Sequence, residues 1–466
     1  MTITAHGDRL GPAAVDRRML RRYRTAISAL FGIAGAVVGA WTARMPAIQH
    51  HLQLSDSQLS IALLALAAGG LAGMRFAGRI VDRRGSAAVA IPTALILGTA
   101  LAATAYAPSL PTLAAALLVL GGVHSLLNVS MNAAALACQN AYQRPIMSGF
   151  HAWFSIGGAL GAATGAACAH IQLSCPATYT AIGASLTMIA ALAVQRLAGH
   201  GPWTTLSELG TPDRTQPTRH RGRILLLGAL AACSLLSEGA IADWSSVYLD
   251  GIGATSTVAA AGYATFAAAM TIGRLTGDRI SARVPAVTLL RASGLLACAG
   301  MTAGILADTP TAAVAGFGLL GAGLSCIVPQ LYTAAGALDP GHPGAGLSRV
   351  ASLGYAGFVL GPVLIGAAAM HVTLGQALLI LPALAGVVAA AAPAVRRPGH
   401  TPAHRRTRLP AATRTRVAAP PNAVLIEVRL LVPACAVHGT PVQQLAATAR
   451  TMSTSAPRTG RESWIS

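Results

Sequence analysis

The sequence contains no lysine: all 33 basic residues among its 466 positions are arginine. Charged residues of both signs make up only 10% of the chain, against about 25% in an average soluble domain. Without lysine the chain cannot form the phosphate-binding loop of an ATPase, a Schiff base with pyridoxal phosphate, or a protein kinase active site. The low charge content excludes a chain of several soluble domains, because their surfaces would lack polar cover.

Metal sites and enzymatic motifs are also missing. The seven cysteines include no CxxC pair and have no histidine nearby at a spacing typical of metal sites. The sequence has no GxSxG, no HExxH and no paired carboxylates at one depth of a span. We therefore expect no cofactor, no metal and no enzymatic activity; a polytopic membrane enzyme remains a distant alternative.

Long apolar runs dominate the sequence instead. Hydrophobic residues make up 54% of the chain, and a helix needs about 20 apolar residues to cross a bilayer. Runs of that kind cover residues 24–43, 57–76, 86–107, 110–137, 146–170, 176–196, 224–249, 257–277, 284–307, 310–337, 347–370 and 373–395. The sequence therefore predicts an all-α membrane protein with twelve transmembrane helices.

The arginines predict the orientation of these helices. With the N-terminus inside, the inner loops and adjoining helix ends hold twenty arginines, Arg274 among them, and the outer loops hold only Arg44. Arg291 falls within a span. Because cytoplasmic loops of membrane proteins are enriched in basic residues, both termini are expected in the cytoplasm, in a bacterial inner (plasma) membrane. The net charge of +19 is thereby assigned to these loops and the tail, and nucleic acid is not an expected partner.

The spans fall into two sets of six, separated by the longest internal polar segment. Two parallel six-helix repeats are a known plan of secondary transporters. The tail is rich in arginine and is expected to be disordered; its Ala/Arg/Pro/Thr mixture also resembles translation in a shifted reading frame. The expected parts are a cytoplasmic segment 1–22, a bundle 23–196, a cytoplasmic linker 197–223, a second bundle 224–395 and the tail 396–466.

The strongest local motif is GRIVDRRGS, after the second span, and a second copy, GRLTGDRISAR, follows the eighth span. The pair resembles the signature loop of the major facilitator superfamily. The resemblance implies that each aspartate faces the positive N-terminus of a span in the other half, the eleventh and the fifth, and stabilises an inner gate. The gate-loop residues are Gly78, Asp82, Arg83, Gly85, Asp278 and Arg279.

Three further segments are similar to the branch of bacterial permeases that includes MosC and the YbjJ-type inner-membrane proteins. They are NVSMNAAALACQNAYQRPIMSGFHAWFSIGGALGA, SEGAIADWSSVYL and GYAGFVLGPVLIG. The resemblance implies transport of a small polar solute by alternating access. Span four lacks the arginine found in many proton-coupled exporters, and span five lacks the Gly-Pro pair of typical antiporters, so drug/proton antiport is disfavoured.

Glu238 is the candidate for proton coupling. It lies within the seventh span, where a charged group costs about 2.5–3.5 kcal/mol even on insertion scales. A carboxylate kept at that cost is a candidate for binding and releasing protons. The alternative is a glutamate satisfied by neighbouring hydroxyl groups, with no role in transport.

Several polar and aromatic side chains are candidates for lining the substrate path. On the fourth span His124, Asn128 and Asn132 recur every four residues, which places them on one helix face. Their donors and acceptors suit the hydroxyl groups of a sugar, although hydrogen bonding between helices would also explain them. Further candidates are Trp153, Trp41, Gln330, Tyr332 and His151. His151 lies close to the cytoplasmic end of the fifth span, so a role at the interface or the gate is an equal alternative to substrate contact.

These patterns together predict a secondary transporter, energised by protons, that takes up a sugar-like or cyclitol-like solute. Its expected partners are the small-molecule substrate, protons and the lipid bilayer, and the chain is expected to be monomeric. Efflux of metabolites or drugs by proton antiport is the alternative within the class. A sensor that no longer transports is a further alternative.

Overall fold

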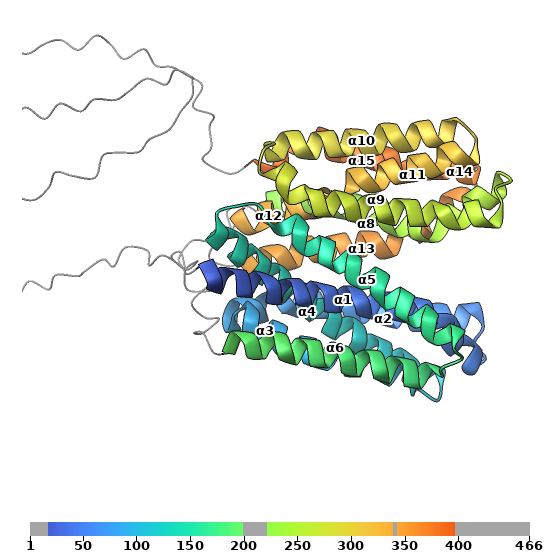
Figure 1. The fold of residues 1–466 in the computed structure, drawn as a ribbon. Coiled ribbons are helices and arrows are strands. Elements are labelled where there is room, and N and C mark those ends of the chain that lie inside the picture. The colour runs from blue at the N-terminus through green and yellow to red at the C-terminus, as the bar shows by residue number, and fades with distance from the viewer. Residues whose placement is uncertain (1–16, 199–220, 339–342, 397–466) are drawn as a thin grey trace, which may run out of the picture. The chain divides into compact units, whose positions relative to one another are not determined.

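The computed structural model describes residues 17–198, 221–338 and 343–396, and within these ranges every regular element is a helix (Figure 1). The first half contains six helices that follow one another through short turns. They are α1 (Arg17–His51), α2 (Asp56–Arg84), α3 (Ser86–Ala105), α4 (Leu110–Tyr142), α5 (Met147–His170) and α6 (Cys175–Ala198).

The second half repeats this pattern with two of its spans divided. Its helices are α8 (Arg221–Gly251), α9 (Ser256–Ser281), α10 (Ala286–Leu306), α11 (Pro310–Leu324), α12 (Ile327–Leu338), α13 (Pro343–Ala369), α14 (Leu374–Leu378), α15 (Ile380–Ala390) and the 3₁₀ helix η1 (Ala392–Val395). Pro329 and Pro382 explain the divisions. Each lacks the N–H that would bond the carbonyl four residues earlier, and those carbonyls, of Ser325 and Leu378, lie where α11 and α14 end.

Eleven segments of the described chain are long and apolar enough to cross a membrane, with α11 and α12 counted together. The last apolar segment, Leu374–Ala390, is shorter. The all-α membrane fold predicted from the sequence is confirmed, with a final span that is divided and short.

The helices form two bundles, α1 to α6 and α8 to η1. In the first bundle α1 packs along α5 and α2 along α4; in the second α8 packs along α13 and α9 along α11. Glycines permit these close approaches. A Cβ on Gly35 of α1 would overlap the carbonyl oxygen of Phe154 in α5, and one on Gly357 of α13 would overlap that of Ala232 in α8. The same packing at equivalent pairs makes the bundles a structural repeat.

The predicted domain boundaries are only partly within the described residues. Helix α1 begins at Arg17, inside the segment 1–22. Residues 199–220 of the predicted linker and 397–466 of the predicted tail lie outside the described ranges.

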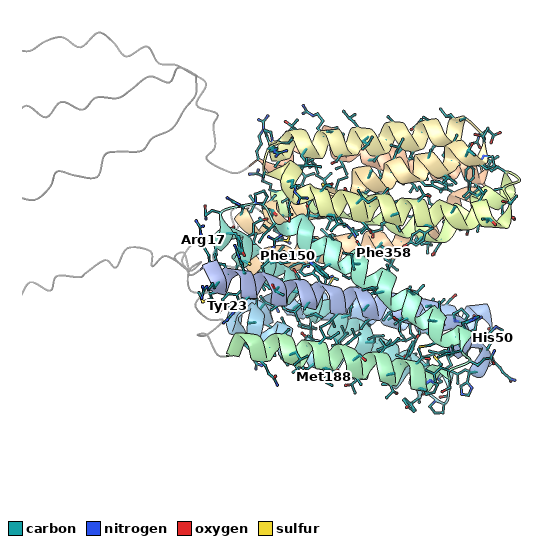
Figure 2. The ribbon with its side chains drawn as sticks, in the orientation of Figure 1. Arg17, Tyr23, His50, Phe150, Met188 and Phe358 are labelled. Atoms are coloured by element: carbon teal, nitrogen blue, oxygen red, sulfur yellow. The ribbon has the colours of Figure 1, made fainter. Side chains whose placement is uncertain are left out.

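The two bundles meet through α2 with α13, α5 with α9, and α12 with α4 and α5. Arg17 and His50 mark the two ends of α1 (Figure 2). We call the end that holds Arg17, Asp82 and Asp278 the signature-loop end. Phe150 of α5, which is 1% exposed, stacks on Phe31 of α1 with ring centroids 5.6 Å apart, so aromatic packing fills the region beside α12.

Candidate functional site

The first signature loop binds the start of a helix in the other bundle. Asp82, near the end of α2, accepts hydrogen bonds from the backbone N–H groups of Gly344 (2.9 Å) and Ala345 (3.0 Å) in α13. The first N–H groups of a helix have no partner within the helix and carry positive partial charge, so a carboxylate is well placed there. A Cβ on Gly344 would lie 2.6 Å from the Asp82 Oδ1 atom, so only glycine lets the carboxylate approach this closely.

The second signature loop makes the equivalent contact in the opposite direction. Asp278 Oδ1 accepts a hydrogen bond of 2.9 Å from the backbone N–H of Gly149 in α5. Its Oδ2 lies 3.6 Å from an Nη atom of Arg24 in α1. Both contacts that the family resemblance implies are therefore present, from α2 to α13 and from α9 to α5.

The remaining gate-loop residues have other positions. Gly78 packs against α13, where a Cβ would lie 2.8 Å from the Cβ of Ser348. Gly85 has φ +86° and joins α2 to α3 in a conformation that favours glycine. Arg83 and Arg279 are exposed.

Gln139, in α4, is a further residue at this end that the sequence analysis missed. Its Oε1 accepts hydrogen bonds from the backbone N–H groups of Ile146 (2.9 Å) and Met147 (3.1 Å), and its Nε2 donates to Thr333 of α12 at 3.3 Å. A buried amide thus caps the start of α5 while it touches the second bundle. Its only sequence signal was a polar residue late in an apolar helix.

Glu238 lies in an ion pair deeper in the protein. Its Oε2 is 3.5 Å from an Nη atom of Arg274 in α9, and the two side chains are 22% and 7% exposed. The other Nη atom of Arg274 donates a hydrogen bond of 2.7 Å to the Ser155 hydroxyl in α5. One guanidinium therefore joins α8 and α9 of the second bundle to α5 of the first.

Arg274 is a buried residue that the sequence analysis counted among the inner loops and adjoining helix ends. It lies seven residues before the end of α9 and is buried. The cost of a charge within a span, the argument that singled out Glu238, applies equally to this arginine and was the signal that could have found it.

His151 and Tyr332 lie beside this ion pair. The His151 ring is 5.3 Å from the ring of Phe31 and 5.8 Å from that of Tyr332, between ring centroids. Arg274 interacts electrostatically with His151, and Glu238 with Tyr332. The structure thus brings together, from α5, α8, α9 and α12, the set that we call the central cluster: His151, Ser155, Glu238, Arg274 and Tyr332.

Of the three polar candidates of α4, His124 contacts another helix, and Asn128 and Asn132 bond each other within α4. An Nε2 atom of His124 lies 3.3 Å from the carbonyl oxygen of Ala34 in α1. The Asn132 amide donates to the backbone (2.8 Å) and side-chain (3.3 Å) oxygens of Asn128 one turn earlier. Among the described residues, no hydrogen bond joins these three side chains to the central cluster.

Three other candidates also lie apart from the cluster. Trp41 is 6% exposed and packs on Tyr179 of α6, with ring centroids 6.3 Å apart. Trp153 is 49% exposed. Because it lies two residues from His151, the directions of the two side chains differ by about 200° around the α5 axis, so Trp153 lies on the opposite face. Gln330 donates to the Ser281 hydroxyl at 2.8 Å, at the signature-loop end of α9.

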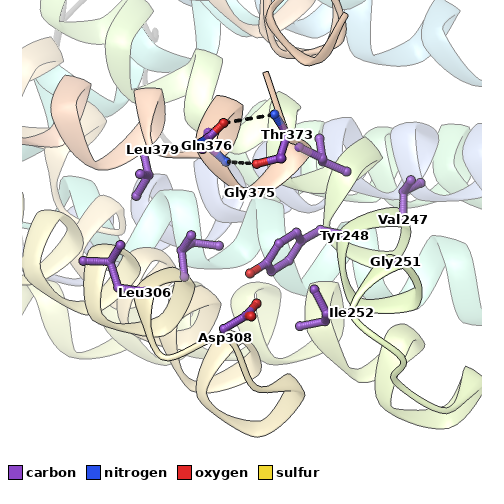
Figure 3. A pocket seen from close by; sticks show the side chains of 12 residues that line it. Val247, Tyr248, Gly251, Ile252, Leu306, Asp308, Thr373, Gly375, Gln376 and Leu379 are labelled. Carbon is purple, nitrogen blue, oxygen red and sulfur yellow. Dashed lines mark hydrogen bonds between the residues drawn. The ribbon is translucent and has the colours of Figure 1, made fainter. Parts of the chain in front are cut away.

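A pocket of about 480 Å³ opens at the end of the second bundle opposite the signature loops, and Tyr248, Asp308 and Gln376 are among its lining residues (Figure 3). Gln376 and Thr373 cap each other at the start of α14. Because Tyr248 lies ten residues beyond Glu238 in α8, the pocket is about 15 Å from the central cluster along that helix. In the part of the chain that the structure describes, no group of three metal-binding side chains exists.

Two six-helix bundles, joined by carboxylates at helix starts and by the buried hydrogen bond of Arg274 to Ser155, define a multi-pass membrane protein of the transporter type. The model of the Major Facilitator Superfamily matches residues 26–335. The chain belongs to the major facilitator superfamily, which is a family of transporters and not of enzymes.

Three relatives each match about four fifths of the chain. The uncharacterized transporter y4wD of Sinorhizobium fredii is 32% identical over 82% of this chain and all of its own length. An uncharacterized MFS-type transporter of Yersinia pestis is 34% identical over 79% of this chain and 94% of its own. The membrane protein MosC of Rhizobium meliloti is 31% identical over 79% and 88%. The expected likeness to the MosC-containing branch is therefore confirmed.

Solved structures share the fold at low sequence identity. FucP in an outward conformation superposes with a TM-score of 0.68 at 15% identity, covering 81% of this chain and all of FucP. The proton:xylose symporter XylE has a TM-score of 0.63 at 11% identity over 80% and 95%. The human organic anion transporter MFSD10 has a TM-score of 0.62 at 13% identity over 81% and 99%.

Proposed function

We propose that this protein is a proton-coupled secondary transporter that moves a small polar solute, sugar-like or cyclitol-like, across the bacterial inner membrane by alternating access. The observation that carries the proposal is the contact of Arg274 with Glu238 on one side and Ser155 on the other. A titratable carboxylate that shares its partner with the opposite bundle can link proton binding to bundle movement.

The coupling follows from the cost of an unpaired charge. Removing one partner of a buried ion pair costs about 3–5 kcal/mol, because the other charge is left uncompensated. When Glu238 takes a proton, Arg274 loses its anionic partner, and its remaining contact is with the first bundle. Protonation therefore weakens the contact of Arg274 within the second bundle and leaves its contact with the first, which changes the relative stability of the two bundle arrangements.

The signature-loop contacts indicate which side of the protein is closed in the arrangement described. With both termini in the cytoplasm, Asp82 and Asp278 lie at the cytoplasmic face, and their contacts with α13 and α5 hold the bundles together there. The arrangement described is then the one closed to the cytoplasm. Reporter fusions at the two termini test this orientation, and a periplasmic terminus would contradict it.

The direct test of function is solute flux in right-side-out and everted vesicles with an imposed pH gradient. Gradient-driven flux is expected in the parent protein and lost in Glu238→Gln. Asp243→Asn is the matched control, because it neutralises an exposed carboxylate of the same helix and is expected to leave the flux unchanged. Flux that does not depend on the pH gradient and is unchanged in Glu238→Gln refutes proton coupling. Accumulation of solute only in everted vesicles favours efflux by proton antiport.

A further inference from the structure

The guanidinium of Arg274 has N–H donors that no hydrogen bond in the described structure uses. An arginine side chain carries five N–H donors and no acceptor. One Nη atom of Arg274 bonds Ser155 at 2.7 Å, the other lies 3.5 Å from Glu238, and its Nε is buried with no hydrogen-bond partner within the described ranges. A buried donor without a partner costs about 1–3 kcal/mol, so an additional acceptor at this position would be stabilised.

The pairing with Glu238 is looser than a permanent ion pair requires. Charge-assisted N–H to carboxylate bonds are commonly about 2.7–2.9 Å long and often bidentate. Here one contact is recorded, at 3.5 Å, and the Glu238 side chain is 22% exposed while that of Arg274 is 7% exposed. The carboxylate is thus the partner that can reach water, and the guanidinium is the one that stays buried.

A second unsatisfied polar atom lies on the face of α5 that carries Ser155, the partner of the guanidinium. The Nε2 atom of His151, one helical turn before Ser155 in α5, is buried without a hydrogen-bond partner in the described structure. The titratable groups that interact electrostatically with the Arg274 and Glu238 pair are His151 of α5, Tyr332 of α12, Tyr263 of α9 and Cys326, between α11 and α12. The site therefore offers unused hydrogen-bonding capacity next to a cation.

We propose that Arg274 is the anion-binding residue of this transporter, and that its substrate is a small polar solute carrying one carboxylate. The inference rests on the proposed transport function and narrows its substrate class, since a hydroxylated acid keeps the sugar-like character. The substrate carboxylate replaces Glu238 as the partner of the guanidinium, which matches a carboxylate in planar, bidentate geometry. His151 Nε2, on the same face of α5 as Ser155, is a second candidate for hydrogen bonding this ligand.

Charge balance then fixes the stoichiometry. The empty site pairs one cation with one anion, Arg274 with Glu238. A bound substrate carboxylate adds a second negative charge, which a buried site accommodates only if Glu238 takes a proton from the water that reaches it. One anion and one proton therefore travel together, and the transport step moves no net charge.

The test is chemical rescue in the full-length purified protein. Glu238→Ala removes the resident carboxylate and leaves Arg274 buried and unpaired, so the melting temperature is expected to fall. Acetate, at constant ionic strength, fills the vacated position and is expected to raise the melting temperature of Glu238→Ala by roughly 1–2 °C, the shift for about 1 kcal/mol of ligand binding in a chain of this length. Acetamide, which has the same shape without the charge, is expected to do nothing.

The controls separate binding at Arg274 from general salt effects. Acetate is expected to leave the melting temperature unchanged in the double variant Glu238→Ala with Arg274→Gln, and also in Asp243→Ala. An equal response to acetate and acetamide, an equal response of the double variant, or no response of Glu238→Ala overturns the proposal. If rescue fails while Glu238-dependent flux persists in vesicles, the inference is wrong and the transport function stands.

A measurement on the parent protein covers the case in which Glu238→Ala does not fold. D-glucuronate is expected to raise the melting temperature of the parent protein, while D-glucose is not, and Arg274→Gln is expected to abolish the difference. The proposal is overturned if glucose raises the melting temperature as much as glucuronate does. It is also overturned if glucuronate, lactate and acetate all leave the melting temperature unchanged.

Discussion

Replacing Asp82 by asparagine should open the signature-loop end of the protein. Asp82 accepts two backbone hydrogen bonds from α13, at 2.9 and 3.0 Å, one on each carboxylate oxygen. Asparagine keeps one acceptor oxygen and turns an NH₂ group toward the other N–H. The variant therefore loses one charge-assisted bond and the favourable charge at the helix start, but gains no compensating contact.

The magnitude follows from these two losses. A hydrogen bond to a charged group contributes about 1.5–3 kcal/mol, and a carboxylate at a helix N-terminus about 0.3–1 kcal/mol. With some compensation by water, the contact should weaken by about 2–3 kcal/mol, which corresponds to a roughly 30- to 150-fold shift toward the open arrangement. The second signature contact, made by Asp278, is unaffected by the substitution.

The shift can be measured as a distance between the bundles. Spin labels on cysteines at Arg84 of α2 and Arg349 of α13 report it, since both positions are exposed, in a background in which the seven native cysteines are replaced by serine. The distance distribution of Asp82→Asn should gain a longer component. Arg83→Gln, at an exposed neighbour, should leave it unchanged. An unaltered distribution in Asp82→Asn would refute the reasoning.

Three further substitutions test the packing and the polar network. Gly35→Ala places a Cβ on a carbonyl oxygen of α5 and should cost about 1–3 kcal/mol of stability, measured as a lower melting temperature. Gly222→Ala is the control and should leave the melting temperature unchanged, because the space around Gly222 is open. Equal effects of the two substitutions would contradict the packing argument. Arg274→Gln should lower the free energy of unfolding by up to about 3–5 kcal/mol, because Glu238 loses its partner. Adding Glu238→Gln to that variant should restore part of the lost stability. Additive effects of the two substitutions on the free energy of unfolding would argue against coupling between the side chains. Gln139→Leu removes the cap of α5 and should cost about 0.5–2 kcal/mol, measurable by thermal unfolding, with an unchanged midpoint speaking against a capping role.

Sequence reasoning reached the polar groups one at a time and could not pair them. It singled out Glu238 from the cost of a charge within a span, but it assigned Arg274 to a helix end because a positive-inside count groups an arginine near the end of a span with the adjoining loop. Gln139 was missed for a related reason. Its partners are backbone N–H groups at the start of the next helix, and no sequence pattern marks an acceptor used in that way.

The sequence by itself determined the environment of this protein and its elements. Twelve apolar runs, an arginine bias and a repeated signature loop are properties of segments, and the bilayer turns each such segment into a helix because backbone groups in lipid must bond within the segment. The tertiary structure alone decided which helix faces meet. Helical periodicity places His151, Trp153 and Ser155 around one axis, but only the packing of α5 between α1 and α9 turns two of them toward Arg274 and leaves Trp153 outside. Contacts between segments distant in sequence depend on how whole helix surfaces fit together, and that fit is not a local property of any segment.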